Sequence, residues 1–322
     1  MKQQSYILST GSYLPEKVMT NKDLEKIVDT TDEWIEQRSG IKERRIAADD
    51  QSTSDMAIQA ARSAIEAAGI SAADIDGIIV ATTTPDDTFP AVAVRVQAAL
   101  GVPVATAFDV QAVCTGFIYA MSIADNFIKG GQLKRILVIG AEKMSSILDW
   151  DDRTTCVLFG DGAGAVILEA RDVSPEQGGV ISTHLYADGT MRDLLHTSGG
   201  VSTTGQSGKI VMQGREVFRN AVNLMAGAVQ AALDANDLTA DQIDWLVPHQ
   251  ANLRIIDATA KKLSLPMDRV VVTVQRHGNT SAASIPLAFD EAVRAGTITR
   301  GQLVLFEALG GGLTWGSALA RY

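Results

Sequence analysis

Stretches with helical spacing of apolar residues alternate with short apolar runs along most of the chain. Apolar positions recur every three or four residues in five segments, 55–68, 116–129, 214–235, 251–263 and 284–295, which predicts helices there. Between them lie continuous apolar runs, typical of strands covered on both faces: IIVATTT, RILVIGAE, WLVPHQ, VVVTV and QLVLFEAL. The alternation predicts an α/β fold with largely parallel, sandwiched sheets.

The two halves of the chain resemble each other. IEAAGISAADIDGII at 65–79 matches LDANDLTADQIDWLV at 233–247 in its apolar, small and acidic positions. RILVIGAE and QLVLFEAL follow at equivalent places, and glycine-spaced strands at 160–170 and 311–322 end the two halves. Three matches in the same order predict a duplication, with an N-terminal half at 1–172 and a C-terminal half at 173–322.

The segment 188–213 departs from the pattern, because HTSGGVSTTGQSGK is rich in Gly, Ser and Thr. It is predicted to be a long loop. Long loops in compact domains are often mobile parts of a site. An unimportant surface insertion is the alternative, and the sequence leaves both open.

Composition narrows the class of protein. With 322 residues, 46% hydrophobic and 20% charged, the chain has the make-up of a compact, soluble enzyme. The net charge of −10 argues against a general nucleic-acid binder, although it allows a local basic patch for an acidic partner. No signal peptide is evident, and no apolar run approaches the ~18 residues of a membrane span.

The two cysteines, Cys114 and Cys156, form no CxxC and no Cys/His cluster with metal-ligand spacing. We therefore expect no disulfide framework and no metal site, and a reducing cytoplasm as the compartment. Cys114 follows a strand-like run, residues 105–110, and precedes a helical stretch. A helix N-terminus there favours the thiolate needed for covalent catalysis. A small core residue is the alternative, and it is the expected role of Cys156, which lies in a strand-like run.

Two other polar residues stand where predicted strands end. His249 ends the strand in WLVPHQAN, where a histidine can exchange protons in a cleft. Asn279, in HGNTSAASIP, can donate a hydrogen bond to an oxygen that becomes negative, or simply cap a helix. We expect His184, His196 and His277 to be structural or solvated. The glycines at 310–312 let a substrate approach backbone N–H groups.

Taken together, AVCTGF around Cys114, PHQAN around His249 and HGNTSAAS around Asn279 resemble the Cys-His-Asn triad of the β-ketoacyl-acyl carrier protein synthase III family. The resemblance extends from GSYLPEKVMTN near the start to GGGLTWGSALARY at the end. It implies the thiolase fold, a layered αβαβα sandwich made of two duplicated βαβαβαββ halves.

The resemblance also implies a reaction. Cys114 would take an acyl group from an acyl-CoA, commonly acetyl-CoA, with the backbone N–H groups of Cys114 and Gly311 holding the thioester oxygen. His249 and Asn279 would then promote decarboxylation of malonyl-acyl carrier protein, and the carbanion would attack the acyl-cysteine. This is the step that initiates type II fatty acid biosynthesis. Acyl-CoA is a substrate here, and no cofactor is expected.

The family match assigns further roles and predicts a homodimer. Trp34, Arg38 and Arg153 would form a CoA site. Leu158 and Phe159 would line an acyl pocket together with the Phe89 ring of the neighbouring subunit. The patch for carrier-protein docking would consist of Arg219, Arg254, Lys261 and Lys262. The bulky Phe89 suggests short primers.

Two alternatives remain. One is a polyketide-type condensing enzyme that uses the same triad, and the other is a catalytically silent subunit that pairs with an active homologue. The sequence leaves primer length, branched-chain preference, feedback regulation and a secondary-metabolism role undecided.

Overall fold

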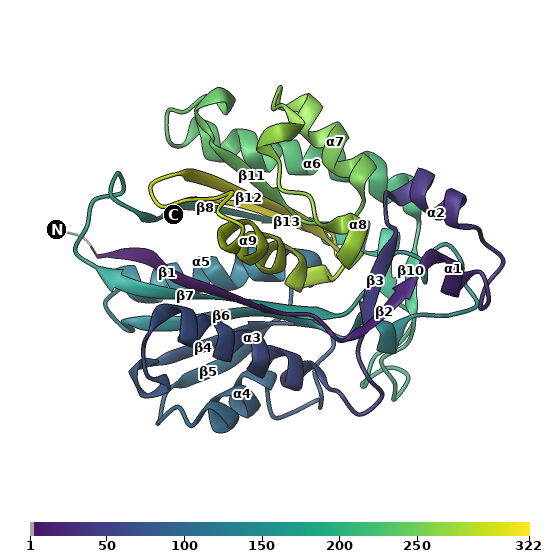
Figure 1. The fold of residues 1–322 in the computed structure, drawn as a ribbon, viewed down its shortest axis with the longest axis horizontal. Helices are drawn as coiled ribbons and strands as arrows, with labels where there is room; N and C mark the ends of the chain where they lie inside the picture. Colours follow the sequence, from purple (N-terminus) through teal and green to yellow (C-terminus); the bar gives the residue numbers. More distant parts are fainter. Residues whose placement is uncertain (1–2) are drawn as a thin grey trace.

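The computed structural model describes residues 3–322 and contains two large mixed sheets (Figure 1). The first has the strand order β1-β7-β6-β4-β5, and all its strands come from the first 171 residues: β1 (Gln4–Tyr13), β4 (Gly77–Ala81), β5 (Thr106–Val110), β6 (Arg135–Glu142) and β7 (Gly162–Arg171). The second has the order β11-β12-β13-β8: β8 (Gly179–Ala187), β11 (Trp245–Pro248), β12 (Leu303–Gly310) and β13 (Thr314–Arg321).

Helices fill the layer between the sheets and cover both outer faces (Figure 1). In chain order the helices are α1 (Asn21–Leu24), α2 (Asp32–Ser39), α3 (Thr53–Ala68), α4 (Val92–Leu100), α5 (Gly116–Lys129), α6 (Gly214–Asp234), α7 (Leu253–Lys262), α8 (Val274–His277) and α9 (Ser284–Arg294). Helices α5 and α9 lie between the two sheets, α3 and α4 cover the first sheet, and α6 and α7 cover the second. The predicted αβαβα sandwich is confirmed.

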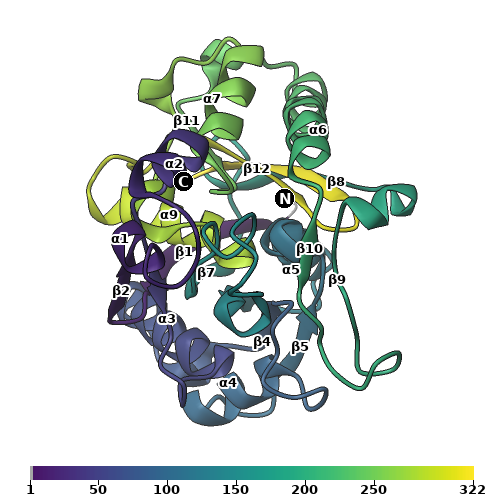
Figure 2. The same cartoon turned by 90° about the vertical axis from the view of Figure 1, so that its right-hand side faces the viewer.

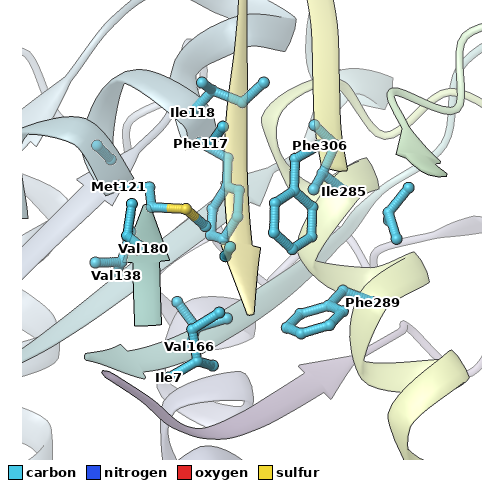
Figure 3. Close-up of a cluster of buried hydrophobic side chains, with 14 of the residues drawn as sticks. Ile7, Phe117, Ile118, Met121, Val138, Val166, Val180, Ile285, Phe289 and Phe306 are labelled. Carbon is cyan, nitrogen blue, oxygen red and sulfur yellow. The ribbon is translucent and has the colours of Figure 1, made fainter. Parts of the chain in front are cut away.

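The central layer forms the largest apolar core. Figure 3 shows Phe117 and Met121 of α5 and Phe289 of α9 packed between strands of the two sheets. The Phe289 ring meets the Phe306 ring edge-on, with centroids 5.0 Å apart. Both helices are apolar on most of their surface, as expected for helices covered on all sides.

The five helices predicted from periodicity are present, and the structure corrects three other expectations. The sheets are mixed rather than largely parallel, because β6 is followed by antiparallel β7, and β12 by antiparallel β13, without an intervening α-helix. Cys156 is buried as expected, but it lies in a turn, not in a strand. The sequence also gave no signal for α1, α2 and α4.

The third correction concerns VVVTV at 270–274, which forms one isolated bridge, between Val270 and Leu246, before α8 begins. The Gln250 side chain forms hydrogen bonds with the backbone of this segment. Its Oε1 accepts hydrogen bonds from the Thr273 and Val274 N–H groups at 2.8 and 3.1 Å, and its Nε2 donates to the Val271 carbonyl. The second half therefore has four strands in its sheet where the first has five.

Two small antiparallel pairs complete the structure. One consists of β2 (Lys17–Thr20) and β3 (Glu43–Ile46), and the other of β9 (Leu195–Thr197) and β10 (Ile210–Met212). The second pair lies inside the segment 188–213, which was predicted to be a loop throughout. That segment is a short hairpin with a Gly- and Ser-rich tip, at the end of the molecule that faces the viewer in Figure 2.

Candidate active site

A cavity of about 1150 Å³ brings together residues from both halves of the chain. Cys114, His249, Asn279 and Gly311 all line it. Cys114, His249 and Gly311 follow the strands β5, β11 and β12. Cys114 and Asn279 also lie shortly before the helices α5 and α9. The predicted convergence of Cys114, His249 and Asn279 on one cavity is therefore present.

Cys114 lies in a single 3-10 turn, Val113–Thr115, that leads from β5 into α5. Val113 has φ of 50°, a conformation that non-glycine residues rarely adopt and that is found at constrained functional sites. The thiol is buried, and burial raises its pKa to about 12. The expectation of a low-pKa thiol is therefore wrong, because loss of solvation outweighs the position at the helix N-terminus.

His249 immediately follows β11, and its ring is buried. Ring Nδ1 lies 2.6 Å from the Ser284 hydroxyl, which also accepts the Gln250 N–H at 3.3 Å. Burial lowers the pKa of His249 to about 3, so the ring is neutral at physiological pH. With the Ser284 hydroxyl donating to Nδ1, the ring proton resides on Nε2, which becomes a hydrogen-bond donor. No local pattern pointed to Ser284, because nothing in SAAS distinguishes it from Ser281.

Asn279 is held by its backbone against the segment after Cys156. Its N–H donates to the Leu158 carbonyl at 2.8 Å, and its carbonyl accepts from Gly160 N–H at 3.0 Å. The side-chain Oδ1 accepts the Ser281 N–H at 2.9 Å, as in an Asx turn. The N-cap of the 3-10 turn that follows is Thr280, so the capping alternative is wrong. Because the oxygen is occupied, the amide Nδ2 is the group left to donate to a substrate.

The end of β12 packs against the backbone of the nucleophile. A Cβ at Gly310 would lie 2.8 Å from the Cys114 nitrogen, so only glycine fits there. Gly311 follows and lines the cavity. This close approach places the backbone of 310–311 beside the backbone of Cys114, where the two segments can present N–H groups to one substrate oxygen.

At the mouth of the cavity, Trp34 of α2 lies beneath two guanidinium groups. The Arg38 and Arg153 Cζ atoms are 5.4 and 5.3 Å from the Trp34 ring centroid. Trp34 and Arg38 line the cavity, whereas Arg153 lies just outside and donates to the Asp29 carbonyl. A planar base stacked between Trp34 and Arg153 needs about 7 Å, two stacking distances, so Arg153 must move outward to admit one.

The basic residues predicted for docking extend over α6 and α7. The Arg254 guanidinium lies 5.6 Å from the Phe218 ring centroid at the cavity rim. Lys262 donates to Asn223 of α6, while Lys261 and Arg219 pair with acidic residues of their own helices. Exposed Arg215, which the sequence reading missed, also lines the cavity.

Leu158 and Phe159 line the cavity, and Phe89 does not. The Phe89 side chain is 83% exposed. The β9–β10 hairpin forms another wall, through residues that include Leu195, Ile210 and Met212. The segment 188–213 is thus part of the site rather than an unimportant insertion.

The remaining histidines differ from one another. His277 is buried, with Nε2 3.3 Å from the Glu291 carboxylate, and His184 contacts Ser182. His196 lines the cavity, although it was expected to be structural or solvated. Within residues 3–322 no cluster of three or more His, Cys, Asp or Glu side chains has the arrangement of a metal site. None of the helices in that range is both long and apolar enough to cross a bilayer.

Comparison with known proteins agrees with this geometry. Residues 108–189 match the family model for 3-oxoacyl-(acyl-carrier-protein) synthase III, and residues 233–322 match the model for its C-terminal part. Beta-ketoacyl-(acyl-carrier-protein) synthase III of Paramagnetospirillum magneticum is 60% identical over 99% of both chains. The protein of the same name from Rhodospirillum centenum is 58% identical over the full length of both.

Solved structures give the same result. The 3-oxoacyl-(acyl-carrier-protein) synthase III of Aquifex aeolicus superposes with a TM-score of 0.94 at 49% identity, covering 99% of this chain and all of that one. A priming β-ketosynthase of a polyketide pathway superposes with a TM-score of 0.93 at 38% identity, covering 99% and 97%. With its fold, its Cys-His-Asn cavity and these relatives, the chain belongs to the β-ketoacyl-(acyl-carrier-protein) synthase III family, condensing acyltransferases of fatty acid biosynthesis.

Proposed function

We propose that the protein condenses a short acyl-CoA, with acetyl-CoA as the first candidate, with malonyl-acyl carrier protein in the cytoplasm. The observation that supports this most is the shared cavity of Cys114, neutral His249 and Asn279 with its free amide. In the first half-reaction the Cys114 sulfur attacks the acyl carbonyl. The bond from that carbonyl to the CoA sulfur breaks, and the thiol proton leaves with CoA.

In the second half-reaction, the malonyl carboxylate leaves as CO2, and its bonding electrons form an enolate at the thioester. His249 Nε2–H and Asn279 Nδ2–H donate to that oxygen, and each such donor is worth ~3 kcal/mol in the transition state. The enolate carbon then attacks the acyl group, the bond to the Cys114 sulfur breaks, and the released thiolate takes up a proton from solvent. The product is a β-ketoacyl-carrier protein.

The experiment that tests this is mass spectrometry of the protein after incubation with acetyl-CoA. We expect acetylation on Cys114 and none on buried Cys156. A catalytically silent subunit would carry no adduct. A polyketide-type enzyme, which the likeness to a priming β-ketosynthase keeps as the second candidate, would acetylate but prefer malonyl-CoA over malonyl-carrier protein as extender.

The docking role of Arg254 gives a kinetic prediction. Arg254→Glu should raise the KM for malonyl-carrier protein by about tenfold, because an acidic carrier then meets a like charge at the rim. The KM for acetyl-CoA should change far less. Arg62→Glu is the control: it makes the same charge change at an exposed position of α3, which covers the outer face of the first sheet. It should alter neither the KM for malonyl-carrier protein nor the KM for acetyl-CoA. An unchanged carrier KM in Arg254→Glu would remove Arg254 from the docking surface.

We also propose a homodimer formed through β5. This strand is the edge of the first sheet and has no partner beyond β4 among residues 3–322. Unpaired edges of this kind are normally covered, and the large apolar side chains of Phe89 and Val104 are exposed nearby.

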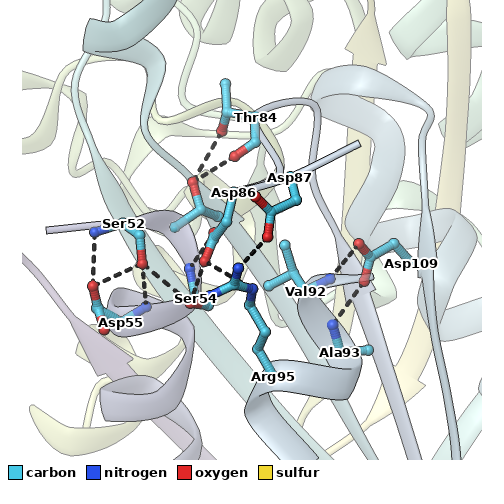
Figure 4. Close-up of polar contacts among 11 residues, drawn as sticks. Ser52, Ser54, Asp55, Thr84, Asp86, Asp87, Val92, Ala93, Arg95 and Asp109 are labelled. Carbon is cyan, nitrogen blue, oxygen red and sulfur yellow. Dashed lines mark hydrogen bonds and ion pairs between the residues drawn. The ribbon is translucent and has the colours of Figure 1, made fainter. Parts of the chain in front are cut away.

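The loop before Phe89 is held rigidly, as a loop that lines a neighbour's pocket would need to be. Figure 4 shows Arg95 paired with Asp86 and Asp87, while Asp86 accepts the Ser54 N–H at 2.9 Å. In such a dimer Phe89 would enter the partner's acyl pocket and limit primer length. A solution mass equal to that of one chain would contradict the dimer.

A further inference from the structure

A buried carboxylate lies behind the nucleophile and has no role in the two half-reactions as written above. Glu142, the last residue of β6, is fully buried and is not among the residues that line the cavity. Its oxygens accept hydrogen bonds from the Thr82, Thr83, Thr84 and Ser281 hydroxyls and from the Thr83 N–H, at 2.7 to 3.3 Å.

Burial raises the pKa of Glu142, but these donors all favour the ionised carboxylate. Thr84 Oγ1 accepts the Lys143 N–H at 2.9 Å, and Thr82 Oγ1 accepts the Thr84 N–H at 3.1 Å. Their hydroxyl protons are therefore free to point at Glu142, which needs no proton of its own. The adjacent Lys143 ammonium does not neutralise it, because it is bonded to the carbonyls of 48, 49 and 51.

Ser281 connects this carboxylate to the catalytic residues. Its hydroxyl donates to Glu142 Oε1 at 3.0 Å, and its N–H donates to Asn279 Oδ1 at 2.9 Å. Its backbone is held at φ of 50°, as Val113 is beside Cys114. A residue in that conformation persists only where its surroundings fix it, and here the bond to Glu142 helps to do so.

We propose that Glu142 is a positioning residue which, through the hydroxyl and N–H groups of Ser281, fixes the orientation of the Asn279 carboxamide. The proposal rests on the function proposed above for Asn279, and it assigns the fixed orientation of that side chain to a group outside the cavity.

Glu142 and Ser281 act on the Cys114 thiol in opposite directions. Burial is the main cause of the raised pKa of this thiol, Ser281 lowers the pKa, and the negative charge of Glu142 raises it further. Glu142→Gln should therefore lower this pKa, and Ser281→Ala should raise it. A purely structural role would shift both variants the same way, so the pair of variants distinguishes the two.

The test measures iodoacetamide alkylation of Cys114 by peptide mass spectrometry between pH 7 and 10, with malonyl-carrier decarboxylation measured in parallel. In Glu142→Gln we expect alkylation at a given pH to be roughly tenfold faster, the effect of one pKa unit. In Ser281→Ala it should be slower than in the parent protein. Both variants should lose about tenfold in the kcat of decarboxylation, with little change in KM, because a misplaced donor weakens transition-state binding only.

Asp290→Asn is the matched control. Asp290 is another buried carboxylate, held by the Thr10 and Ser12 hydroxyls and by the Arg294 guanidinium, on the part of α9 remote from Asn279. It should change neither alkylation nor the kcat of decarboxylation.

Alkylation that shifts in the same direction in both test variants, or parent-like decarboxylation in Glu142→Gln, would overturn the proposal. If Glu142→Gln does not fold, Ser281→Ala alone tests the proposal. Alkylation of Cys114 that is faster in Ser281→Ala than in the parent protein, or unchanged, would contradict the role of Ser281. The alkylation readout needs no acyl substrate, so it remains interpretable even if the function proposed for Asn279 fails.

Discussion

Asn279→Ala should retain acetyl transfer from acetyl-CoA to Cys114 while malonyl decarboxylation falls about 10²- to 10³-fold, the loss typical for removal of one preorganised donor. The physical reason is that the two polar atoms of the carboxamide have different partners. Oδ1 is bonded to the Ser281 N–H, and Nδ2 is left for the enolate oxygen. Acyl transfer places its negative charge at the backbone N–H groups beside Cys114 instead.

Two assays check this expectation separately. Acetyl-Cys114 formation is followed by mass spectrometry in a single turnover, and decarboxylation by release of labelled CO2 from malonyl-carrier protein. Asn252→Ala is the control, since Asn252 lines the same cavity but its carboxamide is bonded to Arg254 N–H and the Arg38 carbonyl. Equal loss of both half-reactions in Asn279→Ala would refute the role given to Asn279.

Glu307→Gln should stabilise the protein, by an amount that grows with pH. Glu307 of β12 is fully buried, and within residues 3–322 neither carboxylate oxygen has a hydrogen-bond partner. Burial raises the pKa of Glu307 from 4.5 to about 8, so the folded protein holds a proton that the unfolded chain releases. The contribution of this proton to the free energy of unfolding is fully present below pH 4.5 and is lost as the pH rises to about 8.

Glutamine keeps the size of the side chain and cannot ionise. The difference in unfolding free energy between Glu307→Gln and the parent protein should therefore widen between pH 4.5 and 8 and level off above. At about 1.4 kcal/mol per pKa unit the gain reaches a few kcal/mol. Thermal melts of both proteins across this pH range measure it. Glu66→Gln, at an exposed position of α3, should give melting temperatures that follow the parent at every pH. A difference that does not change with pH would mean that Glu307 is ionised in the folded state.

The sequence predicted the long helices and the two-half organisation because helical periodicity and apolar runs are local signals. Helix α5 begins and ends where its pattern predicted, and β6 coincides with RILVIGAE. The strand expected at 270–274 failed because the Gln250 side chain, from a distant part of the chain, takes over backbone groups that a ladder would have used. No local pattern contains that information.

The chemical identity of the site was determined by the sequence itself: one thiol, one imidazole and one carboxamide, each in a motif of its own. Only the tertiary structure decided the state of these groups. Burial, which depends on how the two halves pack, makes the thiol protonated and the imidazole neutral. The Ser284 hydroxyl that contacts the imidazole lies 35 positions from His249, and the Ser281–Glu142 contact behind the carboxamide joins residues 139 positions apart. The second of these contacts arises only when the two sheets close around α5 and α9.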